Sequence, residues 1–295
     1  AMAMQGSSIS NCDVGSVTVK LSDEGTYHIT VGCTDMGTGC DTIIAQFAAD
    51  VLETPIDNIS VYGVDTDISP YDSGSYASST TYLTGMAAVK ACEQLRERII
   101  ALAAVRMNKD ASALTFDGEN VIDESDGAKM SLFDIATASM CNNEISLEVT
   151  YSHSSPVSPP PFMAACAEIE ADPETGAIEL LDYTACVDCG TVVNTNLARV
   201  QTEGGLLQGI GMTLYEDIWY DERGKNLSNS FMQYKVPSRL DTDRIRVEFD
   251  SSYEPTGPFG AKSIGEIVIN TPSPALAHAI YNATGLWFRE LPITS

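Results

Sequence analysis

Glu266 is the side chain best suited to acid–base chemistry, because it ends a glycine-rich segment that leads straight into an apolar run. The segment reads Gly257-Pro-Phe-Gly-Ala-Lys-Ser-Ile-Gly-Glu266, and Ile267-Val-Ile269 follows it. A carboxyl group among apolar side chains holds its proton more tightly, since desolvation disfavours the charged form. That environment suits a general base working near neutral pH. The alternative is an ordinary glutamate on a surface loop, and this segment alone does not decide between the two.

Three other segments combine glycine with hydroxyl or acidic side chains and lead into expected helices, which suits them to hold an anionic ligand. They are Thr34–Thr42, Tyr71–Tyr82 and Asp188–Asn194, the last continuing to Gly211. Glycine lets backbone N–H groups approach a ligand, and a helix N-terminus binds phosphate without side-chain charge. Ser and Thr hydroxyls donate or accept, which suits a ligand with ring nitrogens and phosphate. The first segment is not a Walker loop, because no lysine follows its last glycine.

Each of these segments also has a purely structural interpretation. The hydroxyl-rich second segment could be a polar loop that caps the following helix. Glycines at positions 204, 205, 209 and 211 lie within an expected helix, where each costs about 1 kcal/mol relative to alanine. Their number indicates that something packs closely there, and a second helix would satisfy this as well as a cofactor would.

Charge and cysteine content narrow the classes of function. The formal net charge is -25, so nucleic acid would be repelled, and an anionic ligand must be held by neutral donors and a few local cations. Of the eight cysteines only Cys186 and Cys189 have C-x-x-C spacing, and no histidine pair completes a zinc site. We expect buried free thiols in a reducing cytoplasm, with a redox-active C-x-x-C as the alternative. No apolar run approaches the ~20 residues of a membrane helix, and no signal peptide is apparent.

Length and patterning predict two subdomains of the α+β class, with mixed sheets and packed helices. The chain has 295 residues, enough for about two domains of roughly 150 residues. A Pro- and Ser-rich stretch from Ser152 to Pro161 is the expected linker, which gives subdomains 1–155 and 156–295. Strands and helices are mixed without regular βαβ alternation. The opening residues, Ala1–Gly6, look like the middle of a fold rather than its start.

Alternation and helical periodicity predict the individual elements. Expected strands are 16–21 paired with 26–31, 61–64, a hairpin turning at 117–118, 162–171 paired with 177–187, and 244–249. Expected helices are 41–52, 84–107, 132–140, 198–214 and 272–284.

Taken together, the four segments resemble the molybdenum hydroxylases, the xanthine dehydrogenase and aldehyde oxidase family. Gly260–Glu266 resembles the family's G-A-K-G-(I/V)-G-E signature, and Asp188–Gly211 its D-x-G-x-x-x-N-P…G-Q-x-x-G-G-x-x-Q-G-x-G pattern. Asp65–Gly85 resembles D-T-D…D-x-G-(S/T)-x-A-S-R-T-T…G, and Thr34–Thr42 resembles D-(I/M)-G-(Q/T)-G-x-x-T. The motifs follow the family's order and spacing over essentially the whole chain. They correspond to the C-terminal half of the molybdenum-binding subunit, and are similar to the medium molybdopterin subunit of split bacterial nicotinate dehydrogenases. The chain is then a fragment, or one half of a subunit split between two genes.

The resemblance implies roles for individual residues. Glu266 matches the catalytic base, and Ala77 matches the residue beside the molybdenum without being a side-chain ligand. Positions matching those that line the pterin and its pyrophosphate are Met36, Gly37, Thr38, Tyr76, Ala77, Ser78, Ser79, Thr80, Gln201 and Lys262. The chain departs from the family pattern with Ser79 where arginine is common, Thr195 where proline is common, and Ser263 in place of glycine.

The family chemistry implied for the chain is the hydroxylation of an N-heterocycle, purine- or nicotinate-like, with water as the oxygen source. Glu266 would deprotonate a hydroxyl on the metal, the oxygen would attack an electron-poor ring carbon, and hydride would pass to the molybdenum centre. The implied cofactor is molybdopterin with molybdenum, in the cytosine dinucleotide form, and the enzyme would be active only with partner subunits. Those partners would be a subunit carrying the N-terminal half of the molybdenum-binding unit, an iron–sulfur subunit with 2Fe–2S clusters and an FAD subunit.

Three other interpretations stay open at this stage. The chain could be a non-catalytic subunit that holds the cofactor or assists assembly while a partner does the chemistry. It could belong to an aldehyde-oxidising member of the same family. It could also be an acidic α+β interaction protein without a ligand.

Overall fold

The chain divides into two compact units, each with its own hydrophobic core. The computed structural model describes residues 1–142, 147–238, 240–242 and 244–293. Unit 1 comprises Ala1–Gly6, Pro159–Glu254 and Ile264–Ser295, and unit 2 comprises Ser7–Ser158 and Pro255–Ser263. The main transition at 158/159 falls within the expected linker, close to the predicted 155/156 boundary. Two short segments belong to the unit that lies on the other side of the predicted boundary: residues 1–6 to unit 1 and residues 255–263 to unit 2. This was not predicted, because only tertiary contacts assign these segments to their units.

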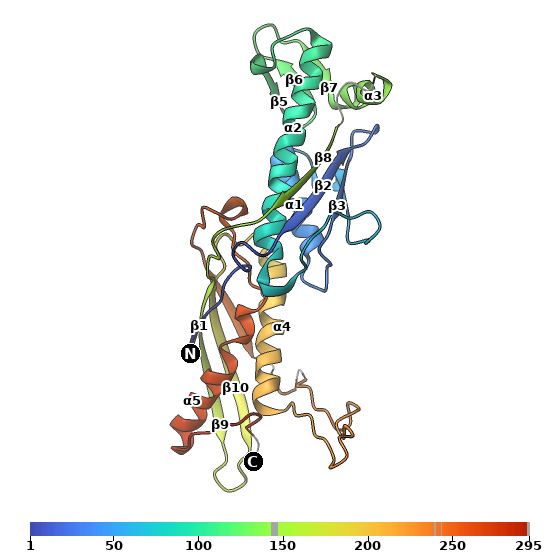
Figure 1. Cartoon of the computed structure of the whole chain (residues 1–295). Coiled ribbons are helices and arrows are strands. Elements are labelled where there is room, and N and C mark those ends of the chain that lie inside the picture. Colours follow the sequence, from blue (N-terminus) through green and yellow to red (C-terminus); the bar gives the residue numbers. More distant parts are fainter. Residues whose placement is uncertain (143–146, 239, 243, 294–295) are drawn as a thin grey trace. The chain divides into compact units, whose positions relative to one another are not determined.

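Unit 2 is built on a four-stranded sheet with helices packed against it (Figure 1). The strand order is β4-β3-β2-β8, in which β2 pairs antiparallel with β3 and β8, and β3 pairs parallel with β4. The strands are β2 (Gly15–Leu21), β3 (Tyr27–Val31), β4 (Ile59–Tyr62) and β8 (Glu148–His153). Alternate residues of β2 and β3 are buried, as expected for strands with one face on a core.

Two helices cover that sheet and supply most of its core. They are α1 (Cys40–Leu52) and α2 (Gly85–Met107), which contact each other, and α2 also lies against β2 and β8. On α1 the buried residues Ile44, Phe47 and Ala48 recur at helical spacing. Beyond α2 the chain forms a small antiparallel sheet, β5 (Leu114–Phe116), β6 (Asn120–Asp123) and β7 (Lys129–Ser131), followed by α3 (Leu132–Asn142).

Unit 1 is a second four-stranded sheet with two helices packed on it. Its order is β1-β9-β10-β11, antiparallel except for the parallel pair β10 and β11. The strands are β1 (Met2–Met4), β9 (Phe162–Ala171), β10 (Ile178–Asp188) and β11 (Ile245–Asp250). The helices are α4 (Thr195–Leu214) and α5 (Pro272–Thr284), which also contact each other. A short turn, Ile267–Ile269, packs on α4 between the glycine-rich signature and α5.

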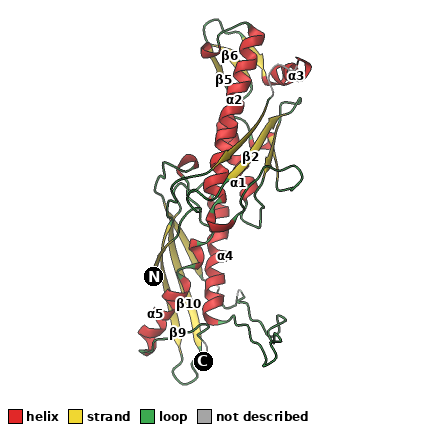
Figure 2. Cartoon of the chain, in the orientation of Figure 1, coloured by secondary structure: helices red, strands yellow, loops and turns green. Residues whose placement is uncertain are grey.

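The predicted α+β class and most predicted elements are confirmed (Figure 2). The strand predicted at 61–64 lies instead at Ile59–Tyr62. Three strands were missed: β1, β7 and β8. β1 and β7 have three residues each, too few to display an alternation. Among the described residues, no helix combines the length and apolarity needed to cross a membrane.

Candidate functional site

Two of the predicted ligand loops lie against each other in unit 2. The loop after β3 and the loop before α2 are joined by Ser75, whose Oγ donates to the Thr34 carbonyl at 3.4 Å. In the first loop Asp35 Oδ1 accepts from the N–H groups of Gly37 and Gly39 at 2.9 and 3.1 Å. Met36 at its tip is 68% exposed, and a Cβ at Gly37 would meet no atom within 4 Å. The predicted residues Met36, Gly37 and Thr38 therefore form an open loop tip.

The second loop has an unusual backbone at the residue predicted to lie beside the metal. Ala77 and Ser78 both have positive φ, 52° and 55°, within the short turn Tyr76–Ser78. Ser8 also has a positive φ, 77°, and its N–H donates to the Ala77 carbonyl at 2.8 Å. Left-handed conformations in residues other than glycine cost on the order of 1–3 kcal/mol and concentrate at functional sites. The strain in these two adjoining segments marks them as a site held in a fixed shape.

The remaining predicted residues of this loop connect it to helix α2. Tyr76 Oη donates to Asp13 Oδ1 at 2.7 Å, and this bond raises the pKa of Tyr76. Ser79 is buried and donates through Oγ to the Gly74 carbonyl at 2.9 Å. Thr80 begins a π-helical turn, Thr80–Thr84, that runs into α2. Such π turns are rare and frequently occur at functional sites.

Lys262 is buried in unit 2 within the glycine-rich signature, only 6% exposed. Its neighbour Ser263 donates through its N–H to Ser7 Oγ at 3.2 Å, and Ser263 Oγ accepts from the Tyr82 N–H at 3.3 Å. These bonds attach the signature segment to the Ser7–Ser8 segment and to the hydroxyl-rich loop. The structure thus gathers Lys262, Ala77 and the other loop residues of unit 2 into one region.

The donor groups of this region suit an anionic, polar cofactor. Ser8 Oγ and Thr80 Oγ1 are buried and have no hydrogen-bond partner among the described residues, and the third such side-chain atom, Tyr27 Oη, lies in the unit 2 core. A buried hydroxyl left without a partner costs about 1–3 kcal/mol. A ligand that hydrogen-bonds to these hydroxyls would remove that cost. With Lys262 as a local cation and the open Met36–Thr38 tip, the residues present fit a molybdopterin group.

Glu266 lies in unit 1 and is exposed in this chain, so the predicted apolar surroundings are wrong. The apolar neighbours Ile267 and Val268 face the core, 0% and 1% exposed, and the turn directs the preceding carboxylate outward. The carboxylate is nevertheless fixed, because Gln5 Nε2 donates to Glu266 Oε2 at 2.5 Å. Gln5 in turn accepts through Oε1 from Asn270 Nδ2 at 3.0 Å.

The structure places Gln201 on α4 of unit 1, where it supports the backbone before Glu266. Its Nε2 donates to the Gly265 carbonyl at 3.2 Å. The third predicted loop precedes this helix, and Asn194 caps it by accepting from the Leu197 N–H at 3.1 Å. Asp188 Oδ1 accepts from the Gly190 N–H at 2.9 Å. The loop thus caps α4, and the close packing predicted at the glycines of this helix is present, because a Cβ at Gly209 would lie 2.6 Å from Pro272 of α5.

The cysteines are free, as predicted, but only half of them are buried. Cys12, Cys141, Cys166 and Cys186 are exposed. The C-x-x-C pair is divided: Cys186 is exposed on β10, whereas Cys189 is buried beyond the strand end.

The first ligand loop also ends at a cluster of possible metal ligands. Ligand atoms of Asp35, Cys40 and Asp41 lie within 4.8 Å of one another. Burial, followed by the charge of Asp35, raises the pKa of Asp41. A hydrogen bond with Cys40, together with burial, raises the pKa of the Cys33 thiol. These groups were not predicted to meet.

Several residues that contact the predicted site residues, some in unit 1 and others in unit 2, were missed in the sequence. Gln5, Ser7 and Ser8 form a polar run at the start of the chain, whose Gly-Ser-Ser composition was the only local signal. Asp13 and Asn270 carried no signal, because each acquires its role from a partner far away in sequence.

Comparison with known proteins identifies the family. The family model of the molybdopterin cofactor-binding domain matches residues 1–243. The chain is 37% identical over its full length to the probable hypoxanthine oxidase XdhD of Escherichia coli, spanning 31% of that protein. It is 31% identical over 94% of its length to the gamma subunit of the 6-hydroxypseudooxynicotine dehydrogenase complex of Paenarthrobacter nicotinovorans, spanning 36% of it.

Solved structures agree with this assignment. Quinoline 2-oxidoreductase from Pseudomonas putida 86 superposes with a TM-score of 0.89 at 25% identity, over 99% of this chain and 40% of that one. The Cu,Mo-CO dehydrogenase superposes with a TM-score of 0.88 at 26% identity, over 99% of this chain and 39% of that one. The chain thus spans about a third of the length of its curated relatives. It belongs to the family described as the molybdopterin cofactor-binding domain.

Proposed function

We propose that the chain supplies the cofactor loops and the general base of a molybdenum-dependent hydroxylase that acts on an N-heterocycle. The observation that carries the proposal is the Glu266 carboxylate, held by Gln5 at the end of the signature that contains buried Lys262. Glu266 lies four positions after Lys262 in the sequence. A fully extended backbone of that length spans at most about 14 Å. The base therefore lies close in the chain to Lys262, one of the residues that would hold the cofactor.

The residues of unit 2 would hold molybdopterin. Lys262 and the N–H groups of the glycine loop would bind its pyrophosphate, as local donors in an acidic chain. The hydroxyls of Ser8 and Thr80, buried without partners, would bond its polar edges. Once bound, the cofactor would supply the redox chemistry, taking an electron pair from the substrate. We propose the cytosine dinucleotide form, with FAD and 2Fe–2S clusters on partner subunits.

Glu266 would act on the oxygen nucleophile. An ionised carboxylate accepts a proton from water as the oxygen attacks an electron-poor carbon beside a ring nitrogen. The substrate then loses hydrogen together with its electron pair, and the oxygen of water remains on the carbon. General-base assistance of this kind contributes about 10²- to 10⁴-fold.

An N-heterocycle is favoured over an aldehyde by the names of the relatives. Hypoxanthine and quinoline are N-heterocycles, and the relative named for hypoxanthine is 37% identical to this chain, against 31% for a relative named for aldehydes. That second relative, PaoC of Escherichia coli O157:H7, is named as an aldehyde oxidoreductase subunit. We therefore keep aldehyde oxidation as the second candidate substrate class for the same site.

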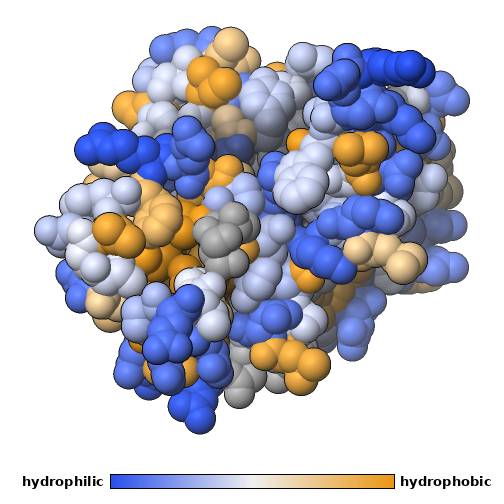
Figure 3. Space-filling model, turned by 90° about the horizontal axis from the view of Figure 1, so that it is seen from below, coloured by the Kyte–Doolittle hydropathy of each residue, from blue (hydrophilic) through white to orange (hydrophobic). Residues whose placement is uncertain are grey.

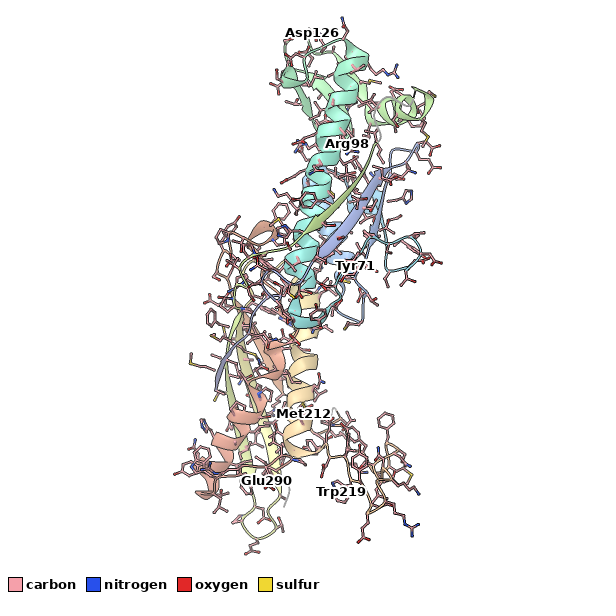
Figure 4. The ribbon with its side chains drawn as sticks, in the orientation of Figure 1. Tyr71, Arg98, Asp126, Met212, Trp219 and Glu290 are labelled. Atoms are coloured by element: carbon pink, nitrogen blue, oxygen red, sulfur yellow. The ribbon has the colours of Figure 1, made fainter. Side chains whose placement is uncertain are left out.

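A partner polypeptide would have to cover Glu266, since a general base works best away from bulk water. We propose that the covering polypeptide corresponds to the portion of the relatives that the given sequence does not span, since it covers 31% and 36% of their lengths. A long arm, residues 216–238, supports this proposal. It follows α4 and exposes large apolar side chains (Figure 4). They are Ile218, Trp219, Tyr220, Leu227, Phe231, Met232 and Val236.

Two adjacent residues of the arm are especially exposed. Phe231 is 84% and Met232 81% exposed. Figure 3 shows apolar side chains reaching the surface among hydrophilic ones on the face that it draws. Seven large apolar side chains exposed within one segment are more than scattered surface residues usually provide, and they favour a protein–protein contact site. The arm therefore fits a partner with an apolar face.

The deciding experiment is Glu266→Gln in the complex co-expressed with its partner subunits. Substrate-dependent dye reduction should fall by ~10²-fold or more, while molybdenum content stays at the wild-type level. Glu290→Gln is the matched control, because Glu290 is an exposed glutamate of unit 1 that belongs to none of the predicted ligand loops (Figure 4). Full activity in Glu266→Gln with stoichiometric molybdenum would instead support a non-catalytic, cofactor-holding role.

A further inference from the structure

Two side-chain amides, those of Asn270 and Gln5, form a short hydrogen-bonded chain that reaches the Glu266 carboxylate. Asn270 Nδ2 donates to Gln5 Oε1 at 3.0 Å, and Gln5 Nε2 donates to Glu266 Oε2 at 2.5 Å. An ionised carboxylate only accepts hydrogen bonds, so the NH₂ group of Gln5 must face Glu266. The oxygen of Gln5 then faces position 270 and needs a donor, which the NH₂ group of Asn270 supplies. A single orientation of the Gln5 amide satisfies both bonds.

Both amides project from backbone that is fixed by other contacts in unit 1. Gln5 follows β1, which pairs with β9, and the Gln5 N–H donates to the Pro161 carbonyl at 3.4 Å. Asn270 follows the turn Ile267–Ile269, and its N–H donates to the Ile267 carbonyl at 3.2 Å. Because the backbone is held in place at both Gln5 and Asn270, their side-chain amides can keep the Glu266 carboxylate in one position rather than move with it.

Gln201 fixes the same region from a second side. Its Nε2 donates to the Gly265 carbonyl at 3.2 Å, so the backbone immediately before Glu266 is held by α4. The side chain and the preceding peptide of Glu266 are therefore restrained independently. Restraint of this kind matters for a general base, because a displacement of about 1 Å can cost a factor of ~10² in rate.

We propose that Gln5 is a positioning residue for Glu266, and that Asn270 sets its amide in the orientation that donates to the carboxylate. The inference rests on the proposed role of Glu266 as the base. A neutral amide orients the carboxylate without placing a cation beside it. Gln5 thereby fixes the direction of the base while leaving it able to take a proton.

Three variants test this in the co-expressed complex. Gln5→Leu removes the donor at similar volume, and kcat should fall ~10- to 10²-fold with little change in KM. Asn270→Asp should be at least as damaging as Asn270→Ala, because an ionised aspartate cannot donate. Gln5 would then turn its NH₂ group toward position 270 and its oxygen toward Glu266. Gln94→Leu, on α2 of unit 2, is the matched control and should keep the wild-type kcat.

A double-mutant cycle separates positioning from a general structural effect. If Gln5 acts through Glu266, Gln5→Leu should cost nothing further in the Glu266→Gln background. An equal loss of rate in both backgrounds would show a structural role and overturn the proposal. So would wild-type kcat in both Gln5→Leu and Asn270→Asp.

A readout independent of turnover is the crystallographic position of the Glu266 carboxylate. It should move in Gln5→Leu while molybdenum content stays unchanged, and an unmoved carboxylate would contradict the proposal. Failure of the proposed function looks different, because Glu266→Gln itself would then be fully active. An inactive Glu266→Gln together with a normal Gln5→Leu would refute this inference alone.

Discussion

The close packing between α4 and the turn after Glu266 gives a sharp prediction for Gly205. A Cβ at Gly205 would lie 2.1 Å from Val268 Cγ2 and 2.9 Å from its Cβ. Val268 is 1% exposed and lies in the turn two residues after Glu266. As a β-branched residue in a filled core it cannot rotate away. Gly205→Ala must therefore displace the turn, the helix or both.

The size of the effect follows from two opposing terms. Alanine in a helix interior is favoured over glycine by about 1 kcal/mol. Overpacking of a filled core costs about 1–3 kcal/mol. Gly204→Ala gains the first term without the second, because nothing lies within 4 Å of a Cβ there. The free energy of unfolding of Gly205→Ala should therefore be lower than that of Gly204→Ala by about 1–3 kcal/mol.

Urea unfolding of the two single variants measures this difference directly, since the helix-propensity term is common to both. Turnover in the complex adds a second measurement, because the displaced turn follows Glu266 directly in the chain. Gly205→Ala should lower kcat, whereas Gly204→Ala should not. Equal unfolding free energies for the two variants would refute the packing argument.

Two further predictions concern stability at low pH and the exposed arm. Burial, and next the charge of Lys90, lower the pKa of His153, so the stability of unit 2 should be retained above about pH 6.5 and decline as the pH falls below it. His153→Gln should flatten the decline of the unfolding free energy between about pH 7.5 and 5.5. If urea unfolding gives the same dependence of that free energy on pH as in the wild type, the assignment to His153 is contradicted. Trp219→Ser with Phe231→Ser should reduce co-purification of the partner subunit, whereas Phe133→Ser, an exposed aromatic on α3, should not. Arm-dependent self-association by light scattering would show that a second copy, and not the partner, occupies the arm.

The local elements of this chain were largely predictable from its sequence. The hairpin of β2 and β3 follows from alternating residues around a glycine-containing turn, and α1 from apolar residues at helical spacing. The glycine-rich signature draws attention to Glu266 as a possible base, whereas the role of Lys262 follows only from the resemblance of the four segments taken together. The hairpin, the helix and the signature itself are encoded within windows of ten to twenty residues, where periodicity and turn chemistry are visible.

Only the tertiary structure decided the surroundings of those residues. The bond from Gln5 to Glu266 joins positions 261 residues apart, and that from Asn270 to Gln5 joins positions 265 apart. The apolar run after Glu266 suggested burial, yet the turn sends Ile267 and Val268 inward and the carboxylate outward. A sequence specifies which side chains are available and how their local backbone repeats. Which of them meet is set by the packing of distant segments, because burial and hydrogen bonding depend on the whole fold.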